Sequence, residues 1–406
     1  MVIFLDYVHN NLVLTSFNQF CIKNKMKIAF YSVVLNHHQV FLADELYQMF
    51  GDNYFFIETV NCCDFKGATA DYSNRPYLIR SWESVDKYKI AMEIALTAEV
   101  CVFAGNEALP FQKERLKMNL LSFDMGERIL KRGLLNLFSP RISYKLLTYH
   151  INKWHKKPLY KLCCSAYAAN DFYLMLAYRN RCFKWGYFTG VDENLDLEEL
   201  NNRKPSGCIS FMWCARFLSL KHPELPVKLA KRLKEKGYVF RIDMYGSGVE
   251  FERTQQLVKK LQVEDVVTLC GNLPNDQILQ KMREHEIFLF TSDKNEGWGA
   301  VANEAMSNGC VILGSDSIGS IPFLVKDGEN GSIYKSCDLD SLTTKAELLL
   351  NDSELRNRMS IKGYETIRDI WSSKNATRNL IQLIDDIRQG REPSIKDGPC
   401  SRAMPL

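Results

Sequence analysis

The chain has 406 residues, of which 46% are hydrophobic and 25% are charged. This balance is typical of a folded globular protein and excludes a disordered chain, and the length favours two domains of about 200 residues each. The net charge of +4 is too small to indicate a nucleic-acid-binding protein. The 13 cysteines are scattered without the spacing of a zinc site, so we expect reduced thiols in a cytoplasmic protein.

The start of the chain does not have the pattern of a leader or of a membrane anchor. Residues 1–25 are apolar in patches interrupted by polar residues, and they lack a basic start and a small-residue cleavage site. No run of eighteen or more residues is uniformly apolar, so we expect no membrane-spanning helix. We interpret residues 1–25 as an N-terminal extension and assign no function to it.

From residue 26 on, apolar runs typical of strands alternate with helical patterns. The first strand, over 26–31, is followed by the polar run Asn36-His37-His38-Gln39 and by a helix over 40–50. This alternation predicts a parallel α/β sheet, in which ligands bind at the carboxyl ends of the strands. The pattern continues with strands over 55–60, 100–104 and 119–123 and helices over 85–98 and 109–117.

The segment 128–161 is basic and contains no acidic residue. Leucines and aromatic residues lie between its cations, which favours attachment to an anionic membrane surface. The alternative is a solvated helix face above a stripe of core residues, and nothing elsewhere in the chain supports nucleic acid as a partner. The cations are Arg128, Lys131, Arg132, Arg141, Lys145, Lys153, Lys156, Lys157 and Lys161.

A linker separates the two halves of the chain. A strand and the start of a helix over 161–171 and the run 183–192 end the first half, and residues 193–207 are acidic and then rich in Asn, Pro, Ser and Gly. The second half starts with a strand over 208–214 and a helix that ends at Gly237. We then expect strands over 240–245 and 266–270 and helices over 250–262, 338–350 and 353–362, with a further helix around Trp371.

A strand–loop–helix–strand unit occupies residues 287–314 of the second half. The apolar run 287–290 predicts a buried strand, residues 300–308 predict a helix that ends at Gly309, and residues 310–314 predict a second buried strand. This is the repeating unit of a parallel α/β sheet, so the loop of the unit stands where such sheets bind their ligands.

The loop of this unit combines glycines with carboxylates. Gly297 and Gly299 flank Trp298 before the helix, so backbone amides at a helix N-terminus are free to approach an anion. Glu296 and Glu304 stand eight positions apart, and a carboxylate accepts hydrogen bonds from paired hydroxyls such as those of a sugar ring or a ribose. Two solvated glutamates are the alternative interpretation.

Two cations stand in an earlier loop, directly after the strand over 208–214. Arg216 and Lys221 are five positions apart. A guanidinium binds an anion through two hydrogen bonds and an ammonium acts as a point charge, so the pair suits a diphosphate. Solvated surface cations are the alternative interpretation.

These residues resemble a known family. Glu296, Glu304 and the glycines around Trp298 are similar to the E-x7-E signature of retaining GT-B glycosyltransferases of family 4, the glycosyl transferases group 1. Arg216 and Lys221 resemble the R-x4-K phosphate clamp of that family. The resemblance covers residues 26–388, more strongly in the second half, and implies an α/β chain with the GT-B fold, in which two Rossmann-like domains face each other across a cleft.

The resemblance also implies a division of the chain. The N-terminal Rossmann-like domain would bind the acceptor, the C-terminal one would bind the nucleotide-sugar, and the last helix would cross back to the N-terminal domain. The expected limits are 1–25 for the extension, 26–192 for the acceptor domain, 193–207 for the linker, 208–375 for the donor domain, 376–388 for the crossing helix and 389–406 for a loose tail.

The implied activity is that of a hexosyltransferase-type enzyme. It would move a sugar from a nucleotide-sugar donor to a saccharide or lipid-linked acceptor, with retention of the anomeric configuration. Arg216 and Lys221 would stabilise the leaving diphosphate, while Glu296 would orient the sugar and Glu304 the ribose. No metal ion and no cofactor is implied. The further donor contacts implied by the resemblance are Gly246, Gly248, Gly271, Asn272, Gly297, Trp298, Gly299 and Ala300.

The resemblance says less about the acceptor side. In the family, the first loop of the N-terminal domain faces the cleft, which implies three contacts here: Asn36, His37 and His38. A later loop often carries a histidine beneath the anomeric carbon of the sugar, and this sequence has no histidine there. Asp124 and Glu127 are the candidate catalytic groups for that place and Arg128 is a further cleft candidate, with an ordinary Glu–Arg surface pair as the alternative.

Other interpretations stay open beside the transferase. One is a non-catalytic GT-B protein that binds sugar nucleotides, and another is a GT-B sugar-nucleotide epimerase. The loop residues 36–39 and 126–128 and the basic segment are similar to those of bacterial surface-polysaccharide glycosyltransferases, which build capsule, O-antigen or exopolysaccharide. That similarity implies a cytoplasmic protein attached peripherally to the inner face of the cytoplasmic membrane.

Overall fold

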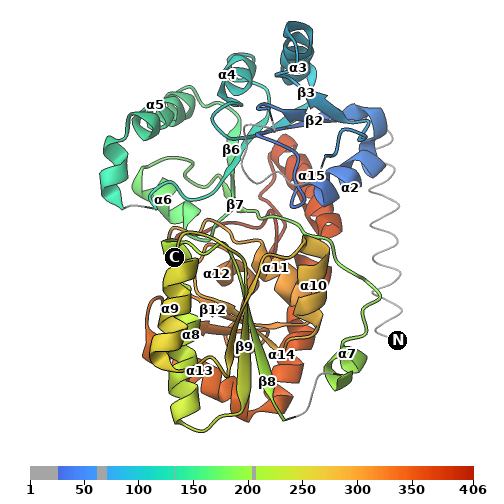
Figure 1. The fold of residues 1–406 in the computed structure, drawn as a ribbon. Coiled ribbons are helices and arrows are strands. Elements are labelled where there is room, and N and C mark those ends of the chain that lie inside the picture. Colours follow the sequence, from blue (N-terminus) through green and yellow to red (C-terminus); the bar gives the residue numbers. More distant parts are fainter. Residues whose placement is uncertain (1–25, 62–70, 132, 204–206) are drawn as a thin grey trace. The chain divides into compact units, whose positions relative to one another are not determined.

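The structure is a computed structural model that describes residues 26–61, 71–131, 133–203 and 207–406 (Figure 1). The predicted N-terminal extension, 1–25, lies outside the described residues, as do residues 204–206 of the predicted linker.

The chain divides into two compact units. The first comprises Met1–Gly126 and Thr148–Leu162, and the second comprises Glu127–Leu147 and Cys163–Leu406. Part of the segment that the sequence assigns to the acceptor domain therefore groups with the second unit, and the limits expected for the domains stay a prediction.

The first unit contains a parallel sheet with the strand order β3-β2-β1-β4-β5-β6. All residues of β1 and β4 are buried, which explains their continuous apolar runs. The predicted bounds of α2, β4 and α4 are confirmed. The elements are β1 (Ile28–Ser32), α2 (Val40–Phe50), β2 (Tyr54–Glu58), β3 (Leu78–Arg80), α3 (Val85–Thr97), β4 (Val100–Ala104), α4 (Leu109–Lys117), β5 (Ser122–Gly126) and β6 (Leu159–Cys163), with α5 (Pro140–Trp154) continuing from the second unit into the first.

Strand β5 begins three residues later than the sequence predicts. Asn119 has φ 57, a turn conformation that closes the end of α4, so the extended chain starts only at Ser122. As a consequence, Asp124 lies within β5, not in the loop after it.

The second unit contains a parallel sheet with the strand order β10-β9-β8-β11-β12-β13. The order reverses at β8, so the sheet is doubly wound, as in Rossmann-like domains. The predicted bounds of β9 and β11 are confirmed. The strands and main helices are β8 (Ile209–Cys214), α8 (Glu224–Glu235), β9 (Phe240–Tyr245), α9 (Phe251–Leu261), β10 (Val267–Gly271), α10 (Asn275–Arg283), β11 (Ile287–Phe290), α11 (Val301–Ser307), β12 (Val311–Ser315), β13 (Ser332–Tyr334), α13 (Leu339–Asn351) and α14 (Ser353–Glu365).

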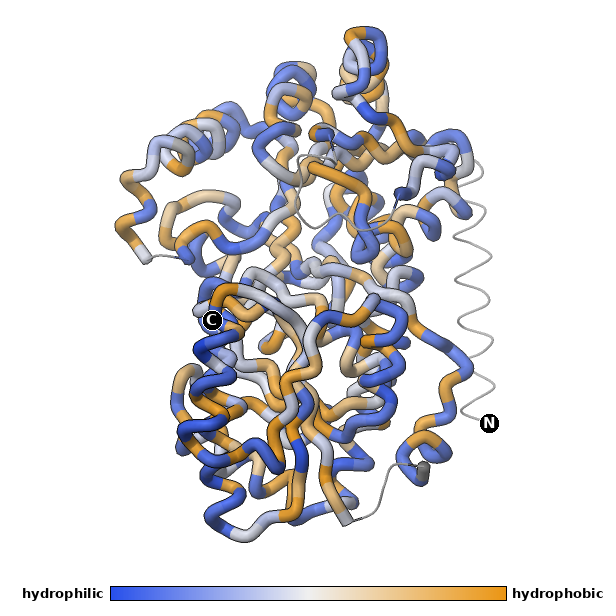
Figure 2. The backbone as a smooth tube through the Cα atoms, viewed as in Figure 1, coloured by the Kyte–Doolittle hydropathy of each residue, from blue (hydrophilic) through white to orange (hydrophobic). Residues whose placement is uncertain are grey.

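Helices cover both faces of this second sheet. Helices α8, α9 and α13 lie on one face and α10, α11 and α14 on the other (Figure 1). Hydrophobic residues concentrate in the strands, whereas the covering helices alternate between hydrophilic and hydrophobic residues (Figure 2). Each helix therefore buries one apolar stripe against the sheet, and the connecting loops at the carboxyl ends of the strands stay available for ligands.

Shorter elements complete the second unit and correct two expectations. The predicted linker contains α7, whose Leu197 and Leu200 pack against Gly309, because two leucines three residues apart supply an apolar stripe that its acidic composition conceals. The helix expected around Trp371 is interrupted there, and a new helix starts with Ser372 as its cap. These elements are η3 (Leu134–Phe138), α6 (Ala168–Leu174), β7 (Cys182–Lys184), α7 (Leu197–Arg203), η4 (Ser219–Lys221), α12 (Ile321–Leu324), η5 (Thr366–Ile370) and α15 (Ser373–Arg388).

The tail is not loose over residues 400–403. The backbone N–H of Lys184 donates to the carbonyl of Ser401 at 2.8 Å, and the N–H of Cys400 donates to the carbonyl of Lys184 at 2.7 Å. Phe183 and Arg402 form an antiparallel bridge, and Cys400 is fully buried. The tail pairs with β7 through backbone hydrogen bonds. Every residue other than proline can form such bonds, so the polar composition of the tail did not indicate this pairing.

Within the described ranges, no helix combines the length and the apolar character needed to cross a bilayer.

Candidate functional site

The two loops with the predicted cations and carboxylates follow neighbouring strands. Residues 215–223, here called the β8–α8 loop, and residues 291–300, here called the β11–α11 loop, leave the carboxyl ends of β8 and β11. These strands are adjacent at the point where the strand order reverses. Ligands of doubly wound sheets bind at this switch point, so the fold brings the two loops together where a ligand is expected.

The predicted cation Lys221 and the predicted carboxylate Glu296 form an ion pair between these loops. Both side chains are mostly buried, with 15% and 13% of their surface exposed. Arg216 lies earlier in the β8–α8 loop with its side chain exposed. Within the part of the chain that the structure describes, its guanidinium has no hydrogen-bond or ion-pair partner, so it is available for an anion.

Three further contacts hold the two loops together. The hydroxyl of Thr291 donates to the carbonyl oxygen of Lys221 at 2.6 Å and accepts a hydrogen bond from Nε1 of the buried Trp213 at 2.9 Å. The backbone N–H of Asp293 donates to the carbonyl of Leu220 at 3.0 Å. These contacts fix the backbone of Lys221, and the ion pair with Glu296 holds its ammonium.

His222 adds a side-chain link between the same loops. Its Nδ1 lies 2.9 Å from Oε1 of Glu224 and its Nε2 lies 3.4 Å from Oδ2 of Asp293. The hydrogen bond with Glu224 raises the pKa of His222, although burial opposes this shift. His222 has a left-handed backbone conformation, with φ 49, and its ring lies between the carboxylates of Glu224 and Asp293.

The glycines of the β11–α11 loop are required by close packing. A Cβ atom on Gly299, which has φ 78, would lie 2.2 Å from Cζ of Phe290. A Cβ atom on Gly319, in the loop after β12, would lie 1.7 Å from the carbonyl oxygen of Gly297. The backbone of the loop is therefore tightly packed against neighbouring elements. Ala300, the next residue, is the N-cap of α11.

Trp298 packs into the interior of the second unit. Its ring is fully buried, lies 5.5 Å from the ring of Trp371 and donates from Nε1 to Oδ1 of Asn303 at 2.9 Å. The ring thus anchors the loop. A donor contact of Trp298 would have to come from its backbone.

Glu304 lies on α11 and is buried. Burial raises the pKa of its carboxyl group to about 7, and a hydrogen bond with the side chain of Asn275 partly opposes the shift. A carboxyl group in this state exchanges its proton near neutral pH, so its ability to accept hydrogen bonds from paired hydroxyls depends on pH.

We expect nucleoside diphosphate binding to strengthen as the pH rises through about 7, because Glu304 then becomes a carboxylate. The folded state holds the proton of Glu304 more tightly than the unfolded state, whose pKa has the ordinary value of 4.5. The free energy of unfolding should therefore fall as the pH rises from 4.5 to about 7. Titration calorimetry between pH 6 and 8, with UDP, GDP and dTDP as probes, measures the first effect.

Glu304→Gln is the reference for that measurement, because the terminal phosphate of the probe also titrates in this range. A pH dependence of the affinity that is the same in Glu304→Gln and in the wild-type protein would contradict the role of Glu304.

The remaining residues predicted to contact the donor lie at the carboxyl ends of β9 and β10. Gly246 and Gly248 have φ 127 and 151, and a Cβ atom on Gly246 would lie 2.0 Å from the carbonyl oxygen of Ala215. The backbone N–H of Gly246 donates to the carbonyl of Gly271 at 2.8 Å, and the side-chain amide of Asn272 donates to the hydroxyl of Ser247 at 2.8 Å. The GxG turn therefore lies directly against the β8–α8 loop.

The predicted acceptor contacts Asn36, His37 and His38 and the catalytic candidate Asp124 belong to the first unit. Asn36 accepts a hydrogen bond from the backbone of His38 at 3.0 Å, and the rings of His37 and His38 lie 3.7 Å apart. Burial and the neighbouring His37 lower the pKa of His38 to about 3. Asp124 is bound by Lys161 at 3.0 Å and by the hydroxyl of Tyr149 at 2.9 Å.

Arg128 and Glu127 belong to the second unit. Arg128 forms an ion pair with the buried Asp171 at 3.2 Å and lies over the ring of Tyr167, which makes it part of the packing. Glu127 lies against Gly297: a Cβ atom on this glycine would meet Oε2 of Glu127 at 1.7 Å. The predicted catalytic candidate Glu127 is thus joined to the β11–α11 loop.

Three residues of the site were missed by the sequence analysis: Thr291, His222 and Tyr187. Thr291 follows an apolar strand directly, and a hydroxyl at that place was a usable signal. His222 is adjacent to Lys221, but its link to Asp293 spans 71 positions and leaves no local pattern. Tyr187, which donates to Oε1 of Glu127 at 3.3 Å, lies 60 positions from its partner.

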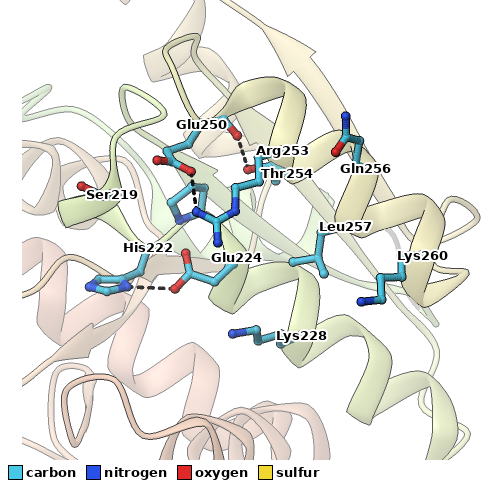
Figure 3. Close-up of a pocket in the computed structure, with 11 residues that line it drawn as sticks. Ser219, His222, Glu224, Lys228, Glu250, Arg253, Thr254, Gln256, Leu257 and Lys260 are labelled. Carbon is cyan, nitrogen blue, oxygen red and sulfur yellow. Dashed lines mark hydrogen bonds and ion pairs between the residues drawn. The ribbon is translucent and has the colours of Figure 1, made fainter.

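A pocket of about 520 Å³ lies beside this site, between α8 and α9 (Figure 3). It shares Ser219 and His222 with the β8–α8 loop, and Figure 3 shows Lys228 and Lys260 on the two helices that border it. Glu224 and Glu250 also line the pocket, so its lining carries both positive and negative charges.

Residues 200–366 match the family described as Glycosyl transferases group 1. The chain is 30% identical over 144 residues to N-acetyl-alpha-D-glucosaminyl L-malate synthase of Bacillus anthracis, covering 36% of this chain and 37% of the relative. It is 24% identical over 202 residues to the putative colanic acid biosynthesis glycosyltransferase WcaL of Salmonella typhimurium, covering 48% and 50%. The matches thus span between about a third and a half of these relatives.

Solved structures have the same fold. The crystal structure of Anabaena HepE in complex with UDP matches with a TM-score of 0.66 at 12% identity, covering 89% of this chain and 100% of that one. Sucrose-phosphate synthase from Thermosynechococcus elongatus matches with a TM-score of 0.67 at 14% identity, covering 90% and 100%. The chain therefore has the GT-B fold, and its residues 200–366 are similar to the glycosyl transferases group 1.

Proposed function

We propose that the protein is a retaining glycosyltransferase that moves a sugar from a nucleotide-sugar to a saccharide or lipid-linked acceptor. The observation that carries this proposal is the ion pair of Lys221 and Glu296 at the switch point of the second sheet, with the exposed Arg216 in the same loop as Lys221. Two cations there suit a diphosphate, and the carboxylate suits the hydroxyls of the adjoining sugar. Developing charge on the leaving diphosphate would be stabilised by Arg216 and Lys221.

These cations also support a reaction without a metal ion or a cofactor. A divalent metal is the usual alternative for neutralising a leaving diphosphate, and the two side chains would supply that charge here. Transfer activity that is unchanged by EDTA is the expected result.

The likeness to curated glycosyltransferases supports a place in surface-polysaccharide synthesis. WcaL is described as a putative colanic acid biosynthesis glycosyltransferase, and a further relative as a poly(glycerol-phosphate) alpha-glucosyltransferase. We accordingly propose a bacterial capsule, O-antigen or exopolysaccharide as the product.

The test is a panel of UDP-, GDP- and dTDP-linked sugars, scored by thermal shift and by release of the nucleoside diphosphate. A binding ligand raises the melting temperature by an amount that grows with the logarithm of its affinity at a given concentration. One nucleotide class should stabilise the protein and also be turned over. Binding without turnover in the presence of saccharide acceptors would favour a non-catalytic GT-B protein, and epimerised sugar in the product would favour an epimerase.

We also propose that the protein binds peripherally to the inner face of the cytoplasmic membrane through the segment from η3 to the end of α5. Four large side chains at helical spacing on α5 are at least 40% exposed: Tyr144, Leu147, Ile151 and Trp154. Leu135 and Phe138 of η3 are 79% and 83% exposed. The exposed apolar side chains of α5 thus form a surface next to lysines, which suits an anionic lipid bilayer.

Replacing Lys153, Lys156 and Lys157 by glutamine should weaken binding to phosphatidylserine-containing vesicles by about 100-fold, at about 1 kcal/mol for each lysine. Co-sedimentation measures the bound fraction. The matched control replaces three lysines of α8 and α9 by glutamine, which changes the net charge equally: Lys228, Lys259 and Lys260. Equal losses in both triple variants would mean that total charge, not this segment, decides the binding.

A further inference from the structure

Glu127 occupies the space beside Gly297 of the β11–α11 loop. A Cβ atom on Gly297 would meet both its Oε2, at 1.7 Å, and its Cδ, at 1.8 Å. The carboxylate therefore packs on the backbone of Gly297, next in sequence to Glu296. In this position it borders the loop that would hold the transferred sugar.

Two side chains hold this carboxylate. The hydroxyl of Tyr187 donates to Oε1 at 3.3 Å, and Nζ of Lys131 lies 2.7 Å from Oε2. Each oxygen therefore has a partner: Lys131 lies four residues further along the same segment, and Tyr187 lies 60 positions away. About 30% of the Glu127 side chain stays exposed, so the carboxylate is fixed and still accessible to a ligand.

Tyr187 is itself fixed by the loop. Its ring lies edge-on to the ring of Trp298, with 6.3 Å between the centroids. Burial, with Glu127 as the next cause, raises the pKa of Tyr187 well above its ordinary value, so the phenol keeps its proton and remains a donor. The tyrosine thus ties Glu127 to the same loop that carries Glu296.

The other candidates for a contact with the sugar are engaged elsewhere. Arg128 is paired with Asp171, whose carboxylate also accepts the backbone N–H groups of Ile129 and Leu130 at 2.8 Å each. This arrangement closes the turn after Glu127 and fixes where its side chain leaves the backbone. Asp124 is bound by Lys161 and Tyr149 within the first unit.

We propose that Tyr187 and Lys131 are positioning residues that hold the carboxylate of Glu127 against Gly297 as a contact of the transferred sugar. This inference rests on the proposed function. A carboxylate there accepts hydrogen bonds from sugar hydroxyls and stabilises the positive charge that develops on the sugar as the diphosphate leaves. No bond between Glu127 and the sugar is part of the proposal.

The test compares binding and turnover in two variants. Glu127→Gln should lower the rate of nucleotide-sugar hydrolysis about 100-fold, as expected when a group that stabilises developing charge is removed. Tyr187→Phe keeps the ring against Trp298 and loses only the hydroxyl, so the rate should fall about tenfold. The affinity for the nucleoside diphosphate alone should stay within about twofold in both variants, because neither side chain is placed on the nucleotide.

The probes are UDP, GDP and dTDP and their glucose conjugates, measured by calorimetry and by release of the diphosphate. Matched controls are Glu264→Gln and Tyr173→Phe, two exposed residues of the same unit that should leave rate and affinity unchanged. The melting temperature of each variant shows whether a lost rate reflects a lost fold.

The outcomes separate this inference from the proposed function. A wild-type rate in Glu127→Gln, or a diphosphate affinity that falls together with the rate, overturns the assignment and leaves the proposed function intact. Diphosphate binding that is absent already in the wild-type protein overturns both.

Discussion

Replacing Lys221 by alanine should weaken nucleoside diphosphate binding by about 100-fold or more, because truncating one partner of a desolvated charge pair between a protein and its ligand costs about 2–5 kcal/mol. The variant loses the cation that we propose lies beside the diphosphate. It also leaves Glu296, with 13% of its side chain exposed, as an uncompensated negative charge in the same place. Titration calorimetry with the diphosphate that stabilises the wild-type protein measures the change.

Two controls separate these causes. Lys260→Ala removes an exposed lysine of α9 and should leave the affinity unchanged. The double variant Lys221→Ala/Glu296→Gln removes the uncompensated charge, so it should recover part of the affinity that Lys221→Ala loses. An affinity of Lys221→Ala within threefold of the wild-type value would contradict the assignment of Lys221 to the diphosphate.

Replacing Trp298 by alanine should lower the free energy of unfolding by about 3–5 kcal/mol, the range for a large aromatic side chain removed from a core. The indole is fully buried, lies within 6.3 Å of the rings of Tyr187, Phe323 and Trp371, and donates to Asn303. The variant leaves a cavity and an unpaired buried amide oxygen. Denaturant unfolding, followed by the fluorescence of the remaining tryptophans, measures the change.

Trp154→Ala is the matched control, since the ring of Trp154 is 71% exposed. It should change the free energy of unfolding by less than about 0.5 kcal/mol. A loss below about 1 kcal/mol in Trp298→Ala would mean that the loop does not depend on its buried ring.

Expectations based on local periodicity were confirmed most closely. The bounds of α2, β4, α4, β9 and β11 were predicted residue by residue, because a buried strand or an amphipathic helix imposes its pattern on adjacent residues. The start of β5 and the interruption at Trp371 were wrong, because each depends on a turn that apolar runs do not mark.

The sequence by itself determined the two α/β sheets and the residues of the second unit that would bind a donor. Arg216, Lys221, Glu296 and Glu304 follow strands or lie on helices that the chain order predicts, and their resemblance to the motifs of a known family marked them as candidates. For the same reason the family resemblance was recognisable in the second half, where residues 200–366 match.

Only the tertiary structure decided which of these groups meet. The contact of Glu127 with Gly297, the hydrogen bond of Tyr187 and the pairing of the tail with β7 join residues that lie between 60 and more than 200 positions apart. The burial that raises the pKa of Glu304 likewise comes from packing around α11. Such contacts depend on the path of the whole chain, and backbone pairing and side-chain proximity across elements leave no periodic trace in the sequence.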